Sequence, residues 1–397
     1  MTSEWRTIRA ADFIDFNPRL SLKKGDIATK VAMDKLKPFT KKIPETEKAE
    51  FNGGAKFCNG DTVMARITPC LENGKTAYVD MLDDGEIGFG STEFIVMRAK
   101  TGISDPQFVY YTAINPVFRN VAIKSMVGSS GRQRVQQSVL EELELSVPDL
   151  DEQRRIGAFL ARLDEKIALN NRINDNLMQQ AVTIFKSWFV EYSPFDGIEP
   201  KEWETVNLEK ITSLISRGIA PKYSDNSDQI VINQKCIRNH MIDLSQARTH
   251  TPKVINEKWL RFGDLLINST GDGTLGRAAQ VWFQPQNITV DSHVTVVRPA
   301  KENLIFYIGL WGVLHEREIE SLHTGSTGQT ELPKERVKAL ELHSPDNGTL
   351  DRFNTLIAPM AAAIVSKQNE NNKLATLRDA LLPKLMSGEI DVSAVQL

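Results

Sequence analysis

The sequence predicts an α+β fold, with two β-rich domains separated by a long antiparallel two-helix coiled coil and an internal pseudo-twofold repeat. Three observations predict it: motifs recur about 197 to 200 residues apart, each half holds short β-branched segments, and each half ends in a heptad pattern. The expected segments are a globular domain at 1–150, a helix at 151–190, a linker at 191–202, a second globular domain at 203–348, a second helix at 349–388 and a C-terminal tail at 389–397.

The repeat is visible as short motifs that occur in the same order in both halves. Each half begins with a Trp in a polar setting and continues with a Gly-Asp turn before an apolar strand. A β-branched strand follows, then a loop of small polar residues, and finally a proline before the helical pattern. The matched positions are Trp5 and Trp203, 60–66 and 263–269, 93–98 and 293–298, 128–133 and 325–330, and Pro148 and Pro345.

Alternating steps of four and three mark the seam of a coiled coil in both helical segments. Polar residues interrupt both seams near their centres, which predicts a polar layer that fixes register at some cost in stability. Two unrelated amphipathic helices, each lying on its own domain, are the alternative. The seam positions are Ile156, Leu160, Leu163, Ile167, Asn170, Asn174, Leu177, Ala181, Ile184 and Trp188, then Phe353, Ile357, Met360, Ile364, Lys367, Asn371, Leu374, Arg378, Leu381 and Leu385.

Connectivity predicts that the two helices are antiparallel. The first helix leads from the first domain to the second, so the second helix can cover it only by running back. Each helix of about 37 residues would span on the order of 55 Å, with one domain at each end of the rod. Asn170 should therefore lie close to Asn371 or Lys367 and not beside Phe353.

Composition excludes several classes of protein. The chain has 397 residues, 41% hydrophobic and 25% charged, with a net charge of −3, so charge alone does not indicate DNA binding. No apolar run is long enough for a membrane span and the start lacks an export-signal pattern, so we expect a cytoplasmic protein without membrane partners. The three cysteines and six scattered histidines lack metal-binding spacing, and no phosphate-binding P-loop motif is present. A glycine pattern at 271–276 precedes a β-like stretch, which favours a hairpin turn over a dinucleotide site.

The motifs together resemble the HsdS family, the specificity subunits of type I restriction-modification systems. The resemblance rests on both Gly-Asp strand starts, on 147–153 (Val-Pro-Asp-Leu-Asp-Glu-Gln), on 184–189 (Ile-Phe-Lys-Ser-Trp-Phe) and on the ending at 377–390, and it covers essentially the whole chain. One departure is that the second helix entry, at 344–351, lacks the equivalents of Glu152 and Gln153. Any partner contact made by that pair would be missing from the second repeat.

The resemblance implies a non-catalytic subunit with two target-recognition domains that read a bipartite, asymmetric site in double-stranded DNA with a fixed spacer. It implies docking of two adenine-N6 methyltransferase (modification) subunits, and of restriction/translocase subunits in the full complex. S-adenosylmethionine, ATP and Mg are expected on those partners, and no cofactor or metal on this chain. For major-groove reading on one face of the duplex, half-site centres would lie about one helical turn, roughly 34 Å, apart. A catalytic methyltransferase or nuclease, and a scaffold without DNA binding, are the alternatives.

Candidate DNA-binding residues come from loops where short hydroxyls can approach phosphates and Arg, Lys, Asn and Gln can reach base edges. The polar loops before the helices rank first, the loops after the Gly-Asp strands second, and the entry loops third. The first-domain candidates are Arg132, Gln133, Arg134, Arg66, Thr68, Asn73, Lys75, Asn17 and Arg19. The second-domain candidates are Gln329, Thr330, Asn268, Ser269, Thr270, Arg277, Arg217 and Lys222.

Overall fold

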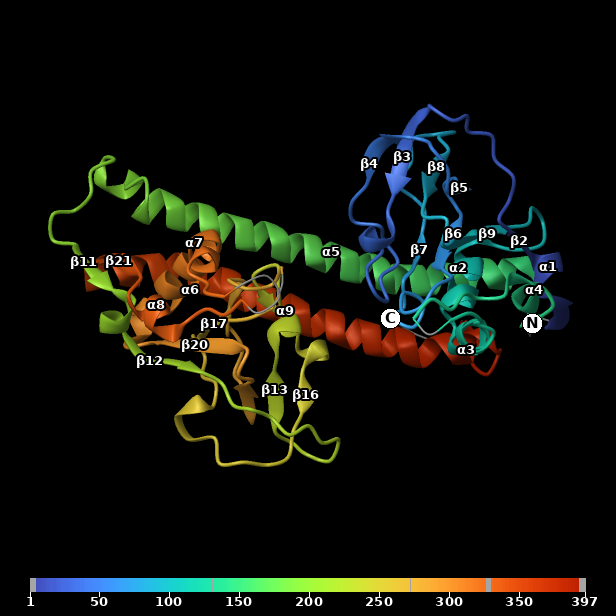
Figure 1. Ribbon diagram of the computed structural model, residues 1–397. Helices are drawn as coiled ribbons and strands as arrows, with labels where there is room; N and C mark the ends of the chain where they lie inside the picture. The colour runs from blue at the N-terminus through green and yellow to red at the C-terminus, as the bar shows by residue number, and fades with distance from the viewer. Residues whose placement is uncertain (1–4, 130, 272, 326–329, 393–397) are drawn as a thin grey trace. The chain divides into compact units, whose positions relative to one another are not determined.

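The protein divides into two compact units, each built from segments distant in the sequence. The computed structural model describes residues 5–129, 131–271, 273–325 and 330–392. The first unit comprises Met1–Asn170 and Glu370–Leu397, and the second comprises Asn171–Asn369. Two 40-residue helices, α5 (Leu150–Phe189) and α9 (Asn347–Met386), each contribute part of their length to both units (Figure 1).

The first unit contains two four-stranded sheets and a short two-stranded one. The larger antiparallel sheet has the order β2-β9-β6-β7, and the other, β4-β3-β8-β5, contains one parallel pair, β3 with β8. Helix α2 packs against the first of these sheets. The strands are β1 (Arg6–Arg9), β2 (Ile14–Phe16), β3 (Ile27–Val31), β4 (Glu47–Glu50), β5 (Ala55–Phe57), β6 (Thr62–Ala65), β7 (Thr76–Tyr78), β8 (Gly88–Gly90), β9 (Phe94–Ala99) and β10 (Glu144–Val147), and the helices before α5 are α1 (Ala10–Phe13), α2 (Pro106–Ile114), α3 (Pro116–Lys124) and α4 (Gln137–Glu141).

The second unit repeats this plan. Its four-stranded sheet has the order β12-β20-β17-β18, and its three-stranded sheet, β16-β13-β19, again contains one parallel pair. The strands are β11 (Glu204–Asn207), β12 (Thr212–Arg217), β13 (Ile230–Ile232), β14 (Ile237–Arg238), β15 (Met241–Ile242), β16 (Arg248–Thr249), β17 (Leu265–Asn268), β18 (Ala278–Gln280), β19 (Ile288–Val290), β20 (Val294–Pro299) and β21 (Glu341–Ser344), and the helices before α9 are α6 (Ile305–Leu314), α7 (Glu316–Ser321) and α8 (Lys334–Lys338).

The Gly-Asp motif makes the same turn and the same ion pair in both units. Gly60 and Gly263 have φ of 93° and 89°, a left-handed conformation that favours glycine. The following carboxylates, Asp61 and Asp264, each accept two hydrogen bonds of 2.7 Å from an arginine on the neighbouring strand, Arg98 or Arg298. These two bidentate pairs, which we call the Asp–Arg clamps, tie the start of β6 to β9 and the start of β17 to β20.

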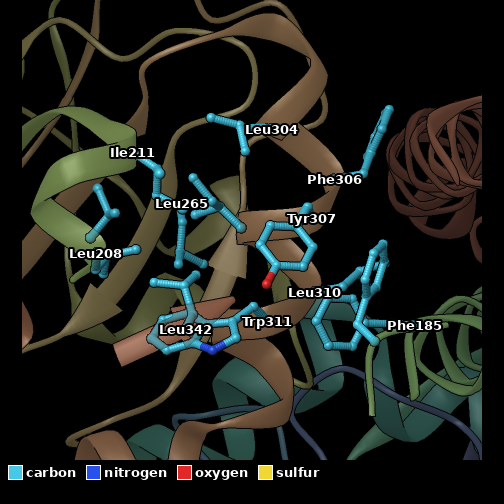
Figure 2. Packing of buried hydrophobic residues seen from close by; sticks show 14 of the residues in the cluster. Phe185, Leu208, Ile211, Leu265, Leu304, Phe306, Tyr307, Leu310, Trp311 and Leu342 are labelled. Atoms are coloured by element: carbon cyan, nitrogen blue, oxygen red, sulfur yellow. The ribbon is translucent and has the colours of Figure 1, made fainter. Parts of the chain in front are cut away.

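The hydrophobic core of the second unit joins its sheet to the long helices. Aromatic and aliphatic side chains from α6, β17 and β21 form one cluster with Phe185 of α5 (Figure 2). Tyr307 packs its ring 5.6 Å from that of Phe185 and donates its hydroxyl to the carbonyl of His343 at 2.6 Å. The first unit has an equivalent core, in which α2 packs between the sheet and the first half of α5.

The coiled-coil seam is confirmed, because every predicted seam position is buried or half-buried. In the first unit, Asn170 Nδ2 donates to Asn371 Oδ1 at 2.9 Å, as the antiparallel topology predicts. Asp164, earlier on α5, contacts Arg378, later on α9, so the two helices run in opposite directions. The expected α+β class with an internal repeat and paired antiparallel helices is therefore confirmed.

A buried polar network distinguishes the seam of the first unit from that of the second. Asp164 accepts hydrogen bonds from Arg378 Nη1 and from the Tyr111 hydroxyl, both at 2.6 Å. Burial by itself would lower the pKa of Arg378, but the carboxylates of Asp164 and Asp379 outweigh burial and raise it. The positions related by the repeat are Ala181 and Ala361, both buried in the apolar core of the second unit. At this pair of positions the seam is thus polar in the first unit and apolar in the second.

Gln153, which has no equivalent at the second helix entry, has a structural role. Its buried side chain accepts a hydrogen bond from the Asp105 amide at 3.0 Å and donates to the carbonyls of Ile103 and Pro148. These bonds join the start of α2 to the start of α5. Glu152 is also buried and pairs with Arg155 on its own helix.

The glycine pattern at 271–276 lies between β17 and β18, which pair antiparallel, so the hairpin prediction is confirmed and a dinucleotide-binding strand–helix unit is absent there. Within the described part of the chain, no helix has the length and apolar character needed to cross a membrane. Nor do the described His, Cys, Asp and Glu residues form a group of three that could hold a metal ion.

Candidate nucleic-acid interface

The polar segment that precedes α4 in the first unit forms a hairpin. Val127 and Arg134 exchange backbone hydrogen bonds of 3.0 and 2.9 Å, which leaves the six residues 128–133 as the loop. Gly128 and Gly131 have φ of 133° and 80°, so the turn depends on glycine. Arg132 and Arg134 are exposed, and Gln133 is half-buried.

The second unit has the corresponding hairpin. Thr324 and Glu331 exchange backbone hydrogen bonds of 2.8 and 2.9 Å and enclose residues 325–330. Thr330 is half-buried at the end of this loop, whereas the candidate Gln329 lies outside the described residues. We call 127–134 and 324–331 the two recognition hairpins.

Each recognition hairpin is attached to the chain that leaves the clamp-bearing strand. In the first unit, the Thr68 amide donates to the Gln133 carbonyl at 3.0 Å, and Val135 donates to the Arg66 carbonyl at 2.8 Å. In the second unit, Leu332 donates to the Ser269 carbonyl at 2.8 Å. The structure therefore brings the first-ranked and second-ranked candidates together, namely Arg66, Thr68, Gln133 and Arg134 in one unit and Ser269, Thr270 and Thr330 in the other.

An ion pair stabilises each recognition hairpin, with the charges reversed between the units. Arg134 donates to both oxygens of Glu93 at 2.6 to 2.9 Å, and these hydrogen bonds lower the pKa of Glu93. In the second unit the equivalent hairpin position is Glu331, which pairs with Arg217 at the end of β12. Arg217 also donates to the Leu332 carbonyl at 2.9 Å. Arg134 is thus fixed within the first hairpin, and Arg217 is fixed beside the second.

Two second-unit candidates are buried, and their side chains make internal hydrogen bonds. Asn268 donates to the carbonyl of Gln234 at 3.1 Å, and the Ser269 hydroxyl lies 2.5 Å from that of Thr295. Asn268 is the last residue of β17 and Ser269 follows it directly, so both lie at the packed end of the strand and not in an exposed loop. They position the loop that carries Thr270, whose hydroxyl lies 2.7 Å from His293 Nδ1.

The remaining candidates are not gathered at the hairpins in the same way. Asn17 supports strand β9, because its side chain accepts from the Val96 amide at 2.9 Å. Lys75 donates to the Met33 carbonyl at 2.9 Å, and Arg277 donates to the Gly273 carbonyl at 2.8 Å. The exposed candidates with no side-chain bond among the described residues are Arg19, Asn73 and Lys222.

Comparison with known proteins shows which proteins this chain is similar to. Residues 3–179 match the model of the type I restriction modification DNA specificity domain. The MjaIX specificity subunit of Methanocaldococcus jannaschii is 26% identical over 68% of this chain and 66% of its own length, just under two thirds. The HindI specificity subunit of Haemophilus influenzae is 22% identical over 83% of this chain and 86% of its own length. Residues 3–179 thus match the type I specificity domain, and most of the chain is similar to HsdS specificity subunits.

The fold agrees with this similarity. The S subunit of the M. genitalium type I restriction-modification system superposes with a TM-score of 0.55 over 96% of each chain, at 14% identity. Specificity subunits are the DNA-recognition components of type I systems and are not their catalytic components. The paired β-rich units and long helices of this chain are thus an architecture that a solved S subunit shares.

Sequence reasoning missed one pair of exposed side chains in the second unit. The guanidinium of Arg248, on β16, stacks on the ring of Tyr223 at 3.6 Å from its centroid. The signal was weak, because Tyr223 and Arg248 are 25 residues apart and only the pairing of their segments brings them together. In the lysine-rich stretch 19–56, by comparison, four of the ten lysines and arginines form ion pairs.

Proposed function

We propose that this chain reads a bipartite, asymmetric sequence in double-stranded DNA, one half-site for each unit, with a spacer fixed by the paired helices. In this proposal it docks two adenine-N6 methyltransferase subunits and, in the full complex, restriction/translocase subunits. S-adenosylmethionine, ATP and Mg belong to those partners, and the chain acts in the cytoplasm, where host DNA is.

The observation that supports this proposal best is the pair of recognition hairpins. Each hairpin is attached to the chain that follows the corresponding strand of its own unit, β6 or β17, and each of these strands begins at an Asp–Arg clamp. The described residues of the two hairpins nevertheless differ in type and charge. A common frame with unlike exposed loops is suited to reading two different short sequences, because base contacts confer specificity while the frame only positions them. Two identical half-sites would not require unlike hairpins.

Docking of two like partners is supported by the helical repeat. Each unit offers a stretch of α5 packed antiparallel against a stretch of α9, and the repeat relates the two stretches. Related surfaces on one chain can receive two copies of the same partner in equivalent ways. The proposed stoichiometry is therefore two methyltransferase subunits for each chain.

Adenine-methylation mapping tests the proposal. The full chain is expressed with its partner methyltransferase subunit, and methylated adenines are located by single-molecule sequencing of the host DNA. We expect one motif with two unlike half-sites and a constant gap, and replacement of residues 1–150 by the first domain of another family member should change one half-site only. A contiguous palindromic motif, or a change in both half-sites, would contradict the proposal. Methylation by the purified chain alone would instead favour the enzyme alternative.

A further inference from the structure

The sheets β4-β3-β8-β5 and β16-β13-β19 differ in how many nearby cations form ion pairs. In the first unit, four lysines around β3 and β4 do so, which joins Lys30 to Glu47, Lys35 to Glu45, Lys42 to Asp80 and Lys48 to Glu86. In the second unit, six lysines and arginines lie between residues 218 and 258, against four acidic residues. Within the described residues, none of these six cations forms an ion pair.

Three of these six cations lie on one ribbon, which we define as 220–224 together with 248–253. The two segments pair along the edge of the sheet β16-β13-β19, through Thr251 N to the Lys222 carbonyl at 2.8 Å and Ser224 N to the Thr249 carbonyl at 3.2 Å. Lys253 crosses back to the other segment and donates to the Ala220 carbonyl at 2.6 Å. The ribbon is therefore a fixed strand pair with exposed Lys222, Arg248 and Lys253.

Tyr223 holds the Arg248 guanidinium in place without using its hydrogen-bond donors. The ring is 40% exposed, and the guanidinium lies 3.6 Å from its centroid. In this stacked position the N–H groups point outward around the rim of the plane, and within the described residues none has a protein acceptor. A planar cation oriented in this way can bind two oxygens of one phosphate.

The ribbon is continuous with the recognition hairpin of the same unit. Arg217, which pairs with Glu331 of that hairpin, is separated from Lys222 by four residues. Gly218, the first of these four, accepts a hydrogen bond from Lys258 Nζ at 3.1 Å through its carbonyl. The ribbon therefore follows, within a few residues of chain, the arginine that is paired with the hairpin.

We propose that the ribbon of the second unit binds the phosphate backbone of duplex DNA through Lys222, Arg248 and Lys253, with Tyr223 as the positioning residue for Arg248. Lysines of the first unit that already form ion pairs, such as Lys30, Lys35 and Lys42, then contribute less to the salt-dependent affinity than the three ribbon cations do. This inference rests on the proposed DNA-reading function and assigns the backbone contacts within it.

The salt dependence of binding tests the inference. The full chain with its methyltransferase partner is titrated by fluorescence anisotropy against a duplex carrying the mapped site, between about 50 and 300 mM KCl. Each lost phosphate contact reduces the slope of log Kd against log salt by about 0.9, so Lys222→Ala/Arg248→Ala/Lys253→Ala should reduce it by about 2 to 3. The ratio of specific to random-sequence affinity should stay within about threefold, because phosphate contacts carry little sequence information.

A matched triple variant in the first unit, Lys30→Ala/Lys35→Ala/Lys42→Ala, removes the same number of cations and should leave the slope unchanged. Tyr223→Leu should weaken binding severalfold, whereas Tyr223→Phe, which retains the ring, should bind as the wild type does. An unchanged slope in the ribbon variant, or an equal loss in the first-unit variant, overturns the inference. If the wild type does not distinguish its site from random duplex, the proposed function fails instead, and the slopes on random duplex still decide the inference.

Discussion

The buried pair of Asp164 and Arg378 tests how the helical seam of the first unit is stabilised. Arg378→Ala leaves the carboxylate of Asp164 buried, with the Tyr111 hydroxyl as its remaining donor among the described side chains. Loss of one partner from a buried ion pair costs about 3 to 5 kcal/mol of unfolding free energy. Asp164→Ala should cost less, about 2 kcal/mol, because Arg378 retains its contact with the exposed Asp379 at 2.7 Å.

The double variant Asp164→Ala/Arg378→Ala recreates the arrangement that the second unit already has with Ala181 and Ala361. It should cost about 1 to 3 kcal/mol less than the sum of the single variants, because neither charge is then left unpaired in the interior. Hydrogen exchange of α5 and α9 peptides within the first unit measures the local free energy of opening, and urea unfolding measures the global one.

The pair of Lys166 and Glu370, which lies in the same seam at 3.5 Å, provides the control. Its side chains are 43% and 35% exposed, so we expect a coupling of less than about 1 kcal/mol from the same double-mutant cycle. Additivity of the Asp164 and Arg378 substitutions within about 0.5 kcal/mol would refute the reasoning, as would a cost below about 1 kcal/mol for Arg378→Ala.

Three further predictions concern stability. Burial lowers the pKa of Lys41 to about 8, so between about pH 8 and 9.5 the unfolded chain keeps a proton that the folded chain releases. Over this range the unfolding free energy of the wild type should therefore rise by roughly 1.5 kcal/mol relative to that of Lys41→Met. Urea titrations at a series of pH values measure this difference, and a difference that does not change with pH would contradict the prediction. Asp264→Asn should cost about 3 kcal/mol and Asp61→Asn about half as much, since the Arg298 side chain is 7% exposed but its counterpart in the first unit is 27% exposed. Tryptophan fluorescence is suited to following the unfolding of Asp264→Asn, because five of the six tryptophans lie in the second unit. If calorimetry gave the two variants equal losses of unfolding free energy, the comparison of the two clamps would be wrong. Gln153→Ala leaves one amide and two carbonyls without their side-chain partner, so hydrogen exchange of the amides at the start of α2 and α5 should become at least tenfold faster. Gln153→Glu should restore the hydrogen bond from the Asp105 amide alone.

The parts of the fold that depend on periodicity and connectivity could be predicted from the sequence. The contact of Asn170 with Asn371 follows from two heptad seams and a chain that must return along itself. The Asp–Arg clamps were not predicted, although both members lie in the matched motifs, because their contact requires β6 and β9 to be neighbours in a sheet. The parallel pairing of β3 with β8 is even harder to predict from the sequence, since these short strands lie far apart in the chain and no single turn joins them.

The candidate site could be predicted in outline and not in the orientation of its side chains. The hairpins were found because small polar residues recur at the same place in both halves. The burial of Asn268 and Ser269 was missed, because both were placed in the loop after the strand, whereas Asn268 is the last residue of β17 and Ser269 follows it directly. The Arg248 stack was missed because it depends on pairing between two irregular segments.

The Asp–Arg clamps have a consequence for how such a protein can change its target over evolutionary time. The clamp residues belong to the sheet frame, while the described residues of the two hairpins are not members of either hydrophobic core. Substitution of those residues should therefore leave the stability of the frame nearly intact. On the proposed function, a lineage could then acquire new recognition sequences without compensating mutations, and each half-site could diverge independently because each frame has its own clamp.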